Sequence, residues 1–415
     1  MAFPKKKDDK EKKPEIRILT ISNIELLRGS INDLCKSQVS MPAVDRPVII
    51  VSTGILSMDL AVGNGGLLGG RIVDTWGEVA TGKTLLAMTV GGYIQRCYKQ
   101  HDGKEVSKIV AFLDAEGTFM VKFAQSAGMD TDTLLLVRST TDKILAGEDY
   151  FEIIIKLVQA NVDYVIVDSC PALVPRAVIL NQFGLAQKAT TASLMSEGLK
   201  MLTPILNSSS NSIVHFINQI RGRPMHAQWE AAMAPTGGEA LKYYSSYRLE
   251  VWASEPIIKK ILLADGTYQS RRVGVRAGIR LYKNKTTTLP EMLPGKSYHF
   301  EYDVYFIEHQ DEDGLVFGRG VDVIKDYVDT GVRTGVIKQR SSWFSFGSIN
   351  ENGQVALTKA IRSQPAIMAE IRNEVFDAFK AQAAAEPVAP SQVVNATEKL
   401  KVTDKKSAMK QPTAN

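Results

Sequence analysis

The chain has 415 residues, of which 44% are hydrophobic and 23% are charged, a composition typical of a globular protein with more than one domain. No apolar run approaches the length of a membrane span, and the charged N-terminal stretch lacks the apolar core of a secretory signal. The three cysteines and five histidines are scattered, which fits neither a disulfide framework nor a zinc-binding spacing. We therefore expect a cytoplasmic protein with no membrane partner.

The net charge of +5 lies at the two ends of the chain. Residues 1–17 carry a net charge of +3 and residues 386–415 one of +2, so the region between them is balanced. If this region binds nucleic acid, local loops must do so, because it has no overall positive field. The composition of both ends is typical of disordered, solvated tails.

Strands and helices are predicted to alternate from about residue 70 to residue 285. Predicted strands are 72–76, 109–113, 134–137, 162–167 and 213–217, and predicted helices are 83–100, 146–159 and 193–206. Continuously apolar strands joined by helical crossovers are typical of a parallel sheet covered on both faces. Beyond residue 240 the strands 247–252, 257–263, 273–282 and 298–306 follow, with a hairpin turn at 264–267. The sequence predicts an α/β fold whose mostly parallel central sheet gains antiparallel strands at one end, followed by a small α/β domain.

One glycine-rich segment matches the phosphate-binding pattern G-x-x-x-x-G-K-[ST] at every fixed position. It follows a predicted strand and opens a predicted helix, which places backbone N–H groups around a phosphate. Its lysine would contact the β- and γ-phosphates, and its threonine hydroxyl would bind Mg²⁺. The segment therefore predicts a nucleoside-triphosphate site with ATP and Mg²⁺ as cofactors, formed by Gly77, Glu78, Val79, Ala80, Thr81, Gly82, Lys83, Thr84 and Leu85.

Two carboxylates are predicted at the same edge of the sheet as this segment. Asp168 ends a buried strand, where it can hold the Mg²⁺ shell together with Thr84. Ser169 follows it, so the base that activates water is not adjacent to Asp168. Glu116, which follows the preceding strand, is the candidate for that base; the alternative is a surface carboxylate at the start of a helix.

Further motifs appear in an order and spacing that resemble the RecA family of DNA strand-exchange recombinases. They are the segments 52–59 (STGILSMD), 65–67 (GGL), 70–73 (GRIV), 167–169 (VDS), 216–221 (FINQIR), 237–244 (GGEALKYY) and 283–285 (KNK). The resemblance extends from about residue 50 to residue 380. It implies a protein that forms an ATP-dependent helical filament on single-stranded DNA, pairs it with homologous duplex DNA and exchanges strands.

The resemblance also assigns roles to individual residues. It makes Lys83 and Glu116 catalytic, and it gives Gln219 the position of a glutamine that senses the γ-phosphate. Lys283 and Lys285 match a lysine pair that reaches the ATP of a neighbouring protomer, which would link hydrolysis to assembly. Phe123 matches an aromatic residue that stacks on adenine.

Two predicted irregular segments, 176–190 and 220–236, correspond to the DNA-binding loops of that family. The second combines cations with flat or flexible apolar side chains, as in sites for single-stranded nucleic acid. For both segments the alternative is a mobile surface loop. The predicted DNA-binding residues are Arg176, Ser196, Lys200, Arg221, Arg223, Met225, Trp229, Gly237 and Gly238.

The chain is thus expected to have five parts. These are a basic tail (1–17), an N-terminal oligomerisation segment (18–50), a RecA-like ATPase core (51–320), a small C-terminal domain (321–382) and a tail (383–415). Expected partners are single-stranded DNA, homologous duplex DNA and further copies of the chain, with single-strand-binding and loader proteins as additional candidates. The alternatives are a ring helicase with the same core and a DNA-coating scaffold that does not hydrolyse ATP.

Several positions depart from the bacterial pattern of the family. Met120 replaces an acid near the adenine, and Glu239 replaces an amide after the two glycines. The second loop is longer by one residue, and the C-terminal tail is not acidic. These departures favour a phage-encoded or divergent bacterial member, acting in the host cytoplasm if phage-encoded.

Overall fold

The computed structural model describes residues 49–101, 104–180, 190–209, 211–222, 233–235, 239–286, 298–312, 314–364 and 366–385. These residues fall in one compact unit that begins at Ile49. The predicted oligomerisation segment and both tails lie outside the described residues, apart from residues 49–50 and the last few residues of α11. None of the described helices is long and apolar enough to cross a membrane.

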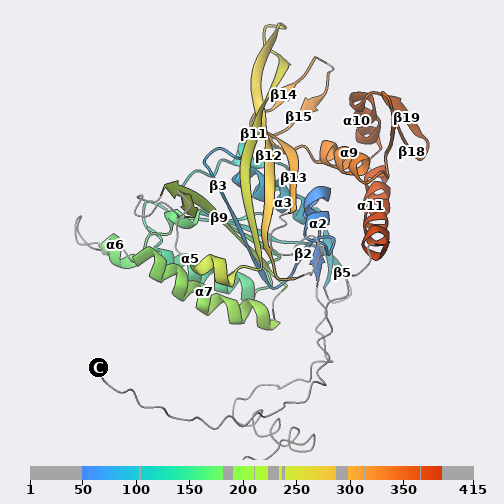
Figure 1. The fold of residues 1–415 in the computed structure, drawn as a ribbon. Helices are drawn as coiled ribbons and strands as arrows, with labels where there is room; N and C mark the ends of the chain where they lie inside the picture. Colours follow the sequence, from blue (N-terminus) through green and yellow to red (C-terminus); the bar gives the residue numbers. More distant parts are fainter. Residues whose placement is uncertain are drawn as a thin grey trace, which may run out of the picture. The chain divides into compact units, whose positions relative to one another are not determined.

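A ten-stranded mixed sheet is the centre of the fold (Figure 1). In spatial order its strands are β16 (Gly320–Val321), β13 (Tyr298–Tyr305), β12 (Tyr268–Asn284), β11 (Tyr247–Leu262), β3 (Arg71–Gly77), β9 (Ile213–Gly222), β8 (Tyr164–Asp168), β6 (Val110–Asp114) and β7 (Leu135–Arg138), and β10 (Met233–Pro235) pairs with β9. Neighbours from β11 to β7 are parallel, whereas β12, β13 and β16 are antiparallel. This confirms the predicted α/β fold class.

Alternate residues of the central strands enter two separate hydrophobic cores. In β8, Tyr164 and Ile166 pack in the core that includes α3 (Lys83–Gln95). Val165 and Val167 pack in the core formed with α5 (Gly147–Gln159) and α7 (Thr190–Ser209), which lie side by side in Figure 1. Because both faces are covered, the strand is apolar throughout, which explains its lack of alternation in the sequence.

Shorter elements complete the described structure. The helices are α2 (Leu56–Ala61), α4 (Val121–Ser126), α6 (Arg176–Leu180), α8 (Ala240–Tyr244), α9 (Val323–Arg333), α10 (Gln354–Ser363) and α11 (Ala366–Ala385), with a 3₁₀ turn at Cys170–Ala172. The strands are β1 (Ile50–Val51), β2 (Leu67–Leu68), β4 (Tyr98–His101), β5 (Lys104–Ser107), β14 (His309–Gln310), β15 (Val316–Phe317), β17 (Lys338–Arg340), β18 (Trp343–Phe346) and β19 (Ile349–Asn352). Two residues of α2 join the core of the C-terminal elements, and Arg372 of α11 pairs with Asp59 at 2.6 Å.

The helix predicted at 83–100 ends earlier than expected. It stops at Gln95, and the residues that follow form β4, which pairs with β5. The sequence has an Asp-Gly pair at 102–103, which is a strong signal for a hairpin turn. The hairpin therefore includes residues that helical periodicity alone would have assigned to the helix.

Two separately predicted strands, 247–252 and 257–263, form the single long strand β11. It pairs with β12 along its length, while its pairing with β3 ends at Val251. Register shifts near Ala253 and Ile257 flank Pro256. Proline is tolerated there because, of the described strands, β12 alone pairs with β11 at Pro256. The predicted turn at 264–267 joins the two strands, with Leu263 N donating to Thr267 O at 2.8 Å.

Candidate functional site

The glycine-rich segment forms a tight loop between β3 and α3. Gly77 lies so close to β11 that a Cβ atom there would come within 2.0 Å of the carbonyl oxygen of Val251. Gly82 has a φ of 89°, in the left-handed region, immediately before α3 begins at Lys83. Both glycines are therefore required by the local backbone, one by close approach and one by conformation.

The Lys83 side chain lies inside this loop and is only 6% exposed. Its Nζ atom donates to the carbonyl oxygen of Gly77 at 3.0 Å and also to that of Glu78. Burial lowers the pKa of Lys83 to about 8, and the charges of Asp168 and Glu116 oppose this shift. A phosphate in the loop would be a stronger acceptor for this ammonium than the two carbonyls.

Thr84 and Asp168 meet beside the loop. Thr84 Oγ1 donates to Asp168 Oδ2 at 2.8 Å, and burial raises the pKa of Asp168 to about 6. Among the described residues there is no group of three or more His, Cys, Asp or Glu side chains that could chelate a metal by themselves. A hydroxyl and a carboxylate suit Mg²⁺, which usually keeps several waters and binds one or two protein groups together with substrate phosphates.

Glu116 is held at the end of β8 by both its backbone and its side chain. Its N–H donates to the Asp168 carbonyl oxygen at 3.2 Å. Its Oε1 accepts hydrogen bonds from Ser169 Oγ and, at 2.8 Å, from Gln219 Nε2. The sequence placed Glu116 and Gln219 near the nucleotide but gave Ser169 no role, although Ser169 follows Asp168 and belongs to the motif at 167–169.

These side chains line one cavity of about 360 Å³, which we call the nucleotide pocket. The predicted residues that line it are Val79, Ala80, Gly82, Lys83, Thr84, Leu85, Glu116, Phe123, Asp168 and Gln219. Ile217 and Phe306 add apolar surface. Phe123 lies in α4, and the Arg319 guanidinium is 5.1 Å from the centre of its ring. The pocket thus combines a phosphate loop, carboxylates and an aromatic ring, and its volume falls in the range of small-molecule sites.

Lys283 and Lys285 lie at the end of β12, next to the C-terminus of α8. Both Nζ atoms donate to the carbonyl oxygen of Tyr243, at 3.3 and 2.8 Å, and Lys283 also donates to that of Lys242. In the described part of the chain neither lysine lines the nucleotide pocket. Burial and the charge of Lys285 lower the pKa of Lys283 to about 8.

The predicted DNA-binding residues are only partly described. Arg176 is half exposed and pairs with Asp149 at 2.6 Å, and Ser196 and Lys200 are exposed on α7. Arg221 belongs to β9. The remaining predicted residues lie outside the described part of the chain: Arg223, Met225, Trp229, Gly237 and Gly238.

Both segments predicted to be irregular contain regular structure. Residues 176–180 form α6, and α7 begins at Thr190. β9 continues to Gly222 and pairs with β10 at 233–235. The apolar residues at 177–180 allow a helical turn, and the antiparallel pairing extends β9 beyond the parallel sheet, so the predicted loops were too long. Glu239, which replaces an amide, pairs with Lys242 at 2.6 Å.

A phosphate-binding loop between a strand and a helix, beside a neighbouring strand that ends in aspartate, defines a P-loop nucleoside-triphosphate-binding protein. Residues 19–292 match the family RecA N-terminal domain. The chain is 34% identical over 332 residues to Protein RecA of Thermus thermophilus, covering 80% of this chain and 85% of the relative. It is 32% identical over 372 residues to Protein RecA of Thermus aquaticus, covering 89% and 95%. The chain belongs to the RecA family.

As a member of this family the protein is a recombinase that carries out homologous pairing and strand exchange. The two alternatives, a ring helicase and a scaffold that does not hydrolyse ATP, are not favoured by these relationships. The fold, the P-loop and the family membership agree with the resemblance carried by the sequence motifs.

Proposed function

We propose that this recombinase couples strand exchange to DNA-dependent hydrolysis of ATP in the nucleotide pocket. The observation that carries the proposal is the placement of the Glu116 carboxylate in the same cavity as Lys83 and Thr84. A carboxylate held by Ser169 and Gln219 can orient a water molecule toward the γ-phosphate and accept its proton. Lys83 and the N–H groups of the loop would bind the phosphates.

Mg²⁺ fits the pair formed by Thr84 and Asp168. When bound, it would neutralise charge on the β- and γ-phosphates. Asp168 is buried and bonded to Thr84, so the pair is fixed before the metal arrives. The Phe123 ring supplies an apolar wall on which adenine can stack.

Gln219 links the nucleotide to the DNA. Its amide contacts Glu116, while the strand that carries it, β9, leads into the second predicted DNA loop. A change in the hydrogen bonds of Glu116 when ATP binds or is hydrolysed would therefore reach that loop through the backbone at the end of β9. We propose that this contact makes hydrolysis dependent on DNA.

A filament would complete the site. Lys283 and Lys285 donate hydrogen bonds to a backbone carbonyl of their own chain. To reach the phosphates of a neighbouring protomer, they would exchange these hydrogen bonds for contacts with the phosphates. Cations from a second protomer would stabilise charge that develops on the γ-phosphate. In the same proposal Arg176, Ser196, Lys200 and Arg221, with the predicted loop residues, contact single-stranded DNA, and residues 51–320 and 321–382 act as ATPase core and C-terminal domain.

The substitution Glu116→Gln tests the proposal. It keeps the size and the hydrogen-bonding capacity of the side chain but removes the base, so ATP hydrolysis on single-stranded DNA should fall about 100-fold or more. ATP binding, measured with a fluorescent analogue, should stay within about twofold because the side chain remains polar and the loop is intact. Glu374→Gln, at an exposed position of α11, is the matched control and should leave turnover unchanged. Full hydrolysis by Glu116→Gln would place the base elsewhere.

A further inference from the structure

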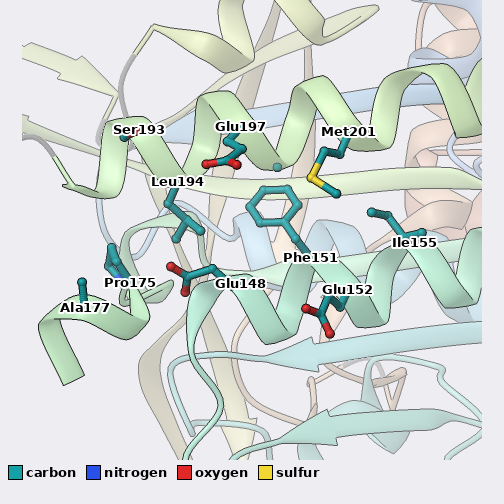
Figure 2. A pocket seen from close by; sticks show the side chains of 11 residues that line it. Glu148, Phe151, Glu152, Ile155, Pro175, Ala177, Ser193, Leu194, Glu197 and Met201 are labelled. Atoms are coloured by element: carbon teal, nitrogen blue, oxygen red, sulfur yellow. The ribbon is translucent and has the colours of Figure 1, made fainter. Parts of the chain in front are cut away.

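A second cavity lies on the face of the sheet covered by α5 and α7 (Figure 2). We call it the α5–α7 groove: its eleven lining residues come from α5, from Pro175 and α6, and from α7. Phe151 and Leu194 are buried at its floor, and Met201 is 56% exposed at its edge. It holds about 360 Å³ and none of its lining residues belongs to the nucleotide pocket.

Close packing of the two helices shapes this groove. A Cβ atom at Gly198 would come within 2.5 Å of the Phe151 ring, and one at Gly147 within 2.2 Å of Leu194. The two glycines let the helices approach, and the large side chains opposite them form a continuous apolar floor. The floor is thus built by side chains that hold the two helices together.

The rim of the groove is acidic. Glu148 and Glu152 lie one turn apart on α5, and Glu197 faces them from α7 (Figure 2). Of the described residues that line the groove, none is basic. Glu148 accepts a hydrogen bond from the Arg176 N–H at 2.8 Å, whereas Glu152 and Glu197 are exposed and form no ion pair with any described residue.

We propose that the α5–α7 groove is a docking site for a basic amphipathic helix of a partner protein. Apolar side chains of that helix would cover Phe151, Leu194 and Met201. Its Lys or Arg side chains would pair with Glu152 and Glu197. Like charges around an apolar hollow are unfavourable by themselves and become favourable when a cationic partner arrives.

The same charges exclude the other ligands of a recombinase from this groove. Phosphates of DNA or of a nucleotide would be repelled by three carboxylates, since none of the described lining residues is a cation. Ser196 and Lys200, which are predicted to bind DNA, lie on the neighbouring face of α7, one position before Glu197 and Met201. One helix thus presents a face suited to DNA and a face suited to a protein.

A helix is the form of partner that suits a hollow between two helices. Recognition of this kind buries an apolar stripe of side chains at i, i+3, i+4 and i+7 while polar side chains reach the rim. The docked helix would also touch Pro175, which precedes the first predicted DNA loop, and Ala177, which lies within it. That segment is tied to α5 by the bond from Gly147 N to the Val174 carbonyl oxygen at 2.7 Å.

Designed peptides test the proposal on the full-length protein. The probe is a fluorescent helical peptide of about 16 residues with Leu and Phe at i, i+3, i+4 and i+7 and Lys elsewhere. An otherwise identical peptide with Glu in place of Lys tests charge, and a scrambled peptide of the same composition tests the apolar stripe. We expect saturable binding of the first peptide, measured by fluorescence anisotropy, that weakens as salt is raised. Equal binding of the acidic or the scrambled peptide would overturn the proposal.

Variants locate the binding. Glu152→Lys combined with Glu197→Lys, and separately Met201→Ser, should each weaken the basic peptide about tenfold. Glu374→Lys and Val355→Ser are control substitutions at exposed positions of α11 and α10 and should bind like the parent protein. Unchanged ATP binding by every variant shows that the chain is folded. Two results would overturn the proposal. One is peptide binding that is equally strong in the groove variants and the parent protein. The other is self-association of the protein, measured by sedimentation, that displaces the peptide.

Discussion

The nucleotide pocket and the α5–α7 groove hold nearly the same volume, about 360 Å³ each, but their charged side chains differ. The nucleotide pocket contains Lys83 and the amides of the phosphate loop, and its carboxylates are bonded to Thr84, Ser169 and Gln219. The groove has three carboxylates and no cation among the lining residues that the structure describes. The charged side chains and their hydrogen bonds therefore distinguish an anion site from a site for a cationic partner. The volume of the two cavities does not distinguish them.

Lys83→Ala should give the largest difference between ligand binding at the nucleotide pocket and peptide binding at the groove. It removes the buried ammonium that the phosphates would contact, so affinity for an ATP analogue should fall about 100-fold and hydrolysis should be lost. Binding of the basic peptide to the groove should stay unchanged because the two cavities share no lining residue. Analogue titration and peptide anisotropy on the same preparation measure both.

Lys338→Ala is the matched control for this substitution. Lys338 is exposed on β17 and lines neither the nucleotide pocket nor the groove. The variant should therefore bind ATP and exchange strands like the parent protein. A loss of analogue binding in Lys338→Ala equal to that in Lys83→Ala would show that the effect is one of overall charge and not of the phosphate loop.

Substitution of the lysine pair should give the next largest effect. If Lys283 and Lys285 act on a neighbour's phosphates, the double substitution to alanine should lower hydrolysis on single-stranded DNA about 100-fold. In the absence of DNA, the monomeric variant should bind the ATP analogue with an affinity within about twofold of the parent's. This is because neither lysine is among the described residues that line the nucleotide pocket of their own chain. Equal loss of binding and turnover in the monomeric variant would instead place the pair in the site of its own protomer.

The nucleotide pocket was largely predictable from the sequence, whereas the groove was not. The phosphate loop is a local motif, and Asp168 and Glu116 follow strands whose carboxyl ends meet at one edge of a parallel sheet. The groove depends on contacts between residues far apart in the chain, such as Gly198 against Phe151. No spacing rule relates those two positions, so the sequence predicted only two helices, at 146–159 and 193–206.

The fold shows the same limit. The order of strands and helices followed from apolar runs, but the end of the helix at Gln95 and the continuous strand β11 were decided by pairing with β5 and β12. Ser169, next to the nucleotide pocket, shows the same limit of prediction from sequence. Its neighbour Asp168 was identified as the end of a strand, yet the bond from the Ser169 hydroxyl to Glu116 depends on the tertiary structure.

The last prediction compares a buried titratable group of the central sheet with an exposed one at the rim of the groove. His215 of β9 is fully buried, with Thr75 Oγ1 2.6 Å from its Nε2 and the Tyr164 hydroxyl at its Nδ1. Burial lowers its pKa from 6.5 to about 3. As the pH falls through 6.5, His215 is therefore protonated in the unfolded chain but not in the folded chain. Its contribution to the free energy of unfolding is fully present above pH 6.5 and is lost as the pH falls toward 3. Between about pH 7 and pH 5.5 the free energy of unfolding should fall by about 1 kcal/mol because of this group.

Chemical denaturation at the two pH values measures that loss, with His215→Gln as the comparison. The glutamine variant should be less stable at both values, because it cannot reproduce both hydrogen bonds, but it should lack this part of the pH dependence. Glu152→Gln, at the exposed rim of the groove, should leave the pH dependence over this interval as it is in the parent, because it keeps His215 with its Thr75 and Tyr164 partners. An unchanged pH dependence in His215→Gln would mean that the folded sheet accepts the proton, and would remove the contrast between this buried histidine and the exposed rim of the groove.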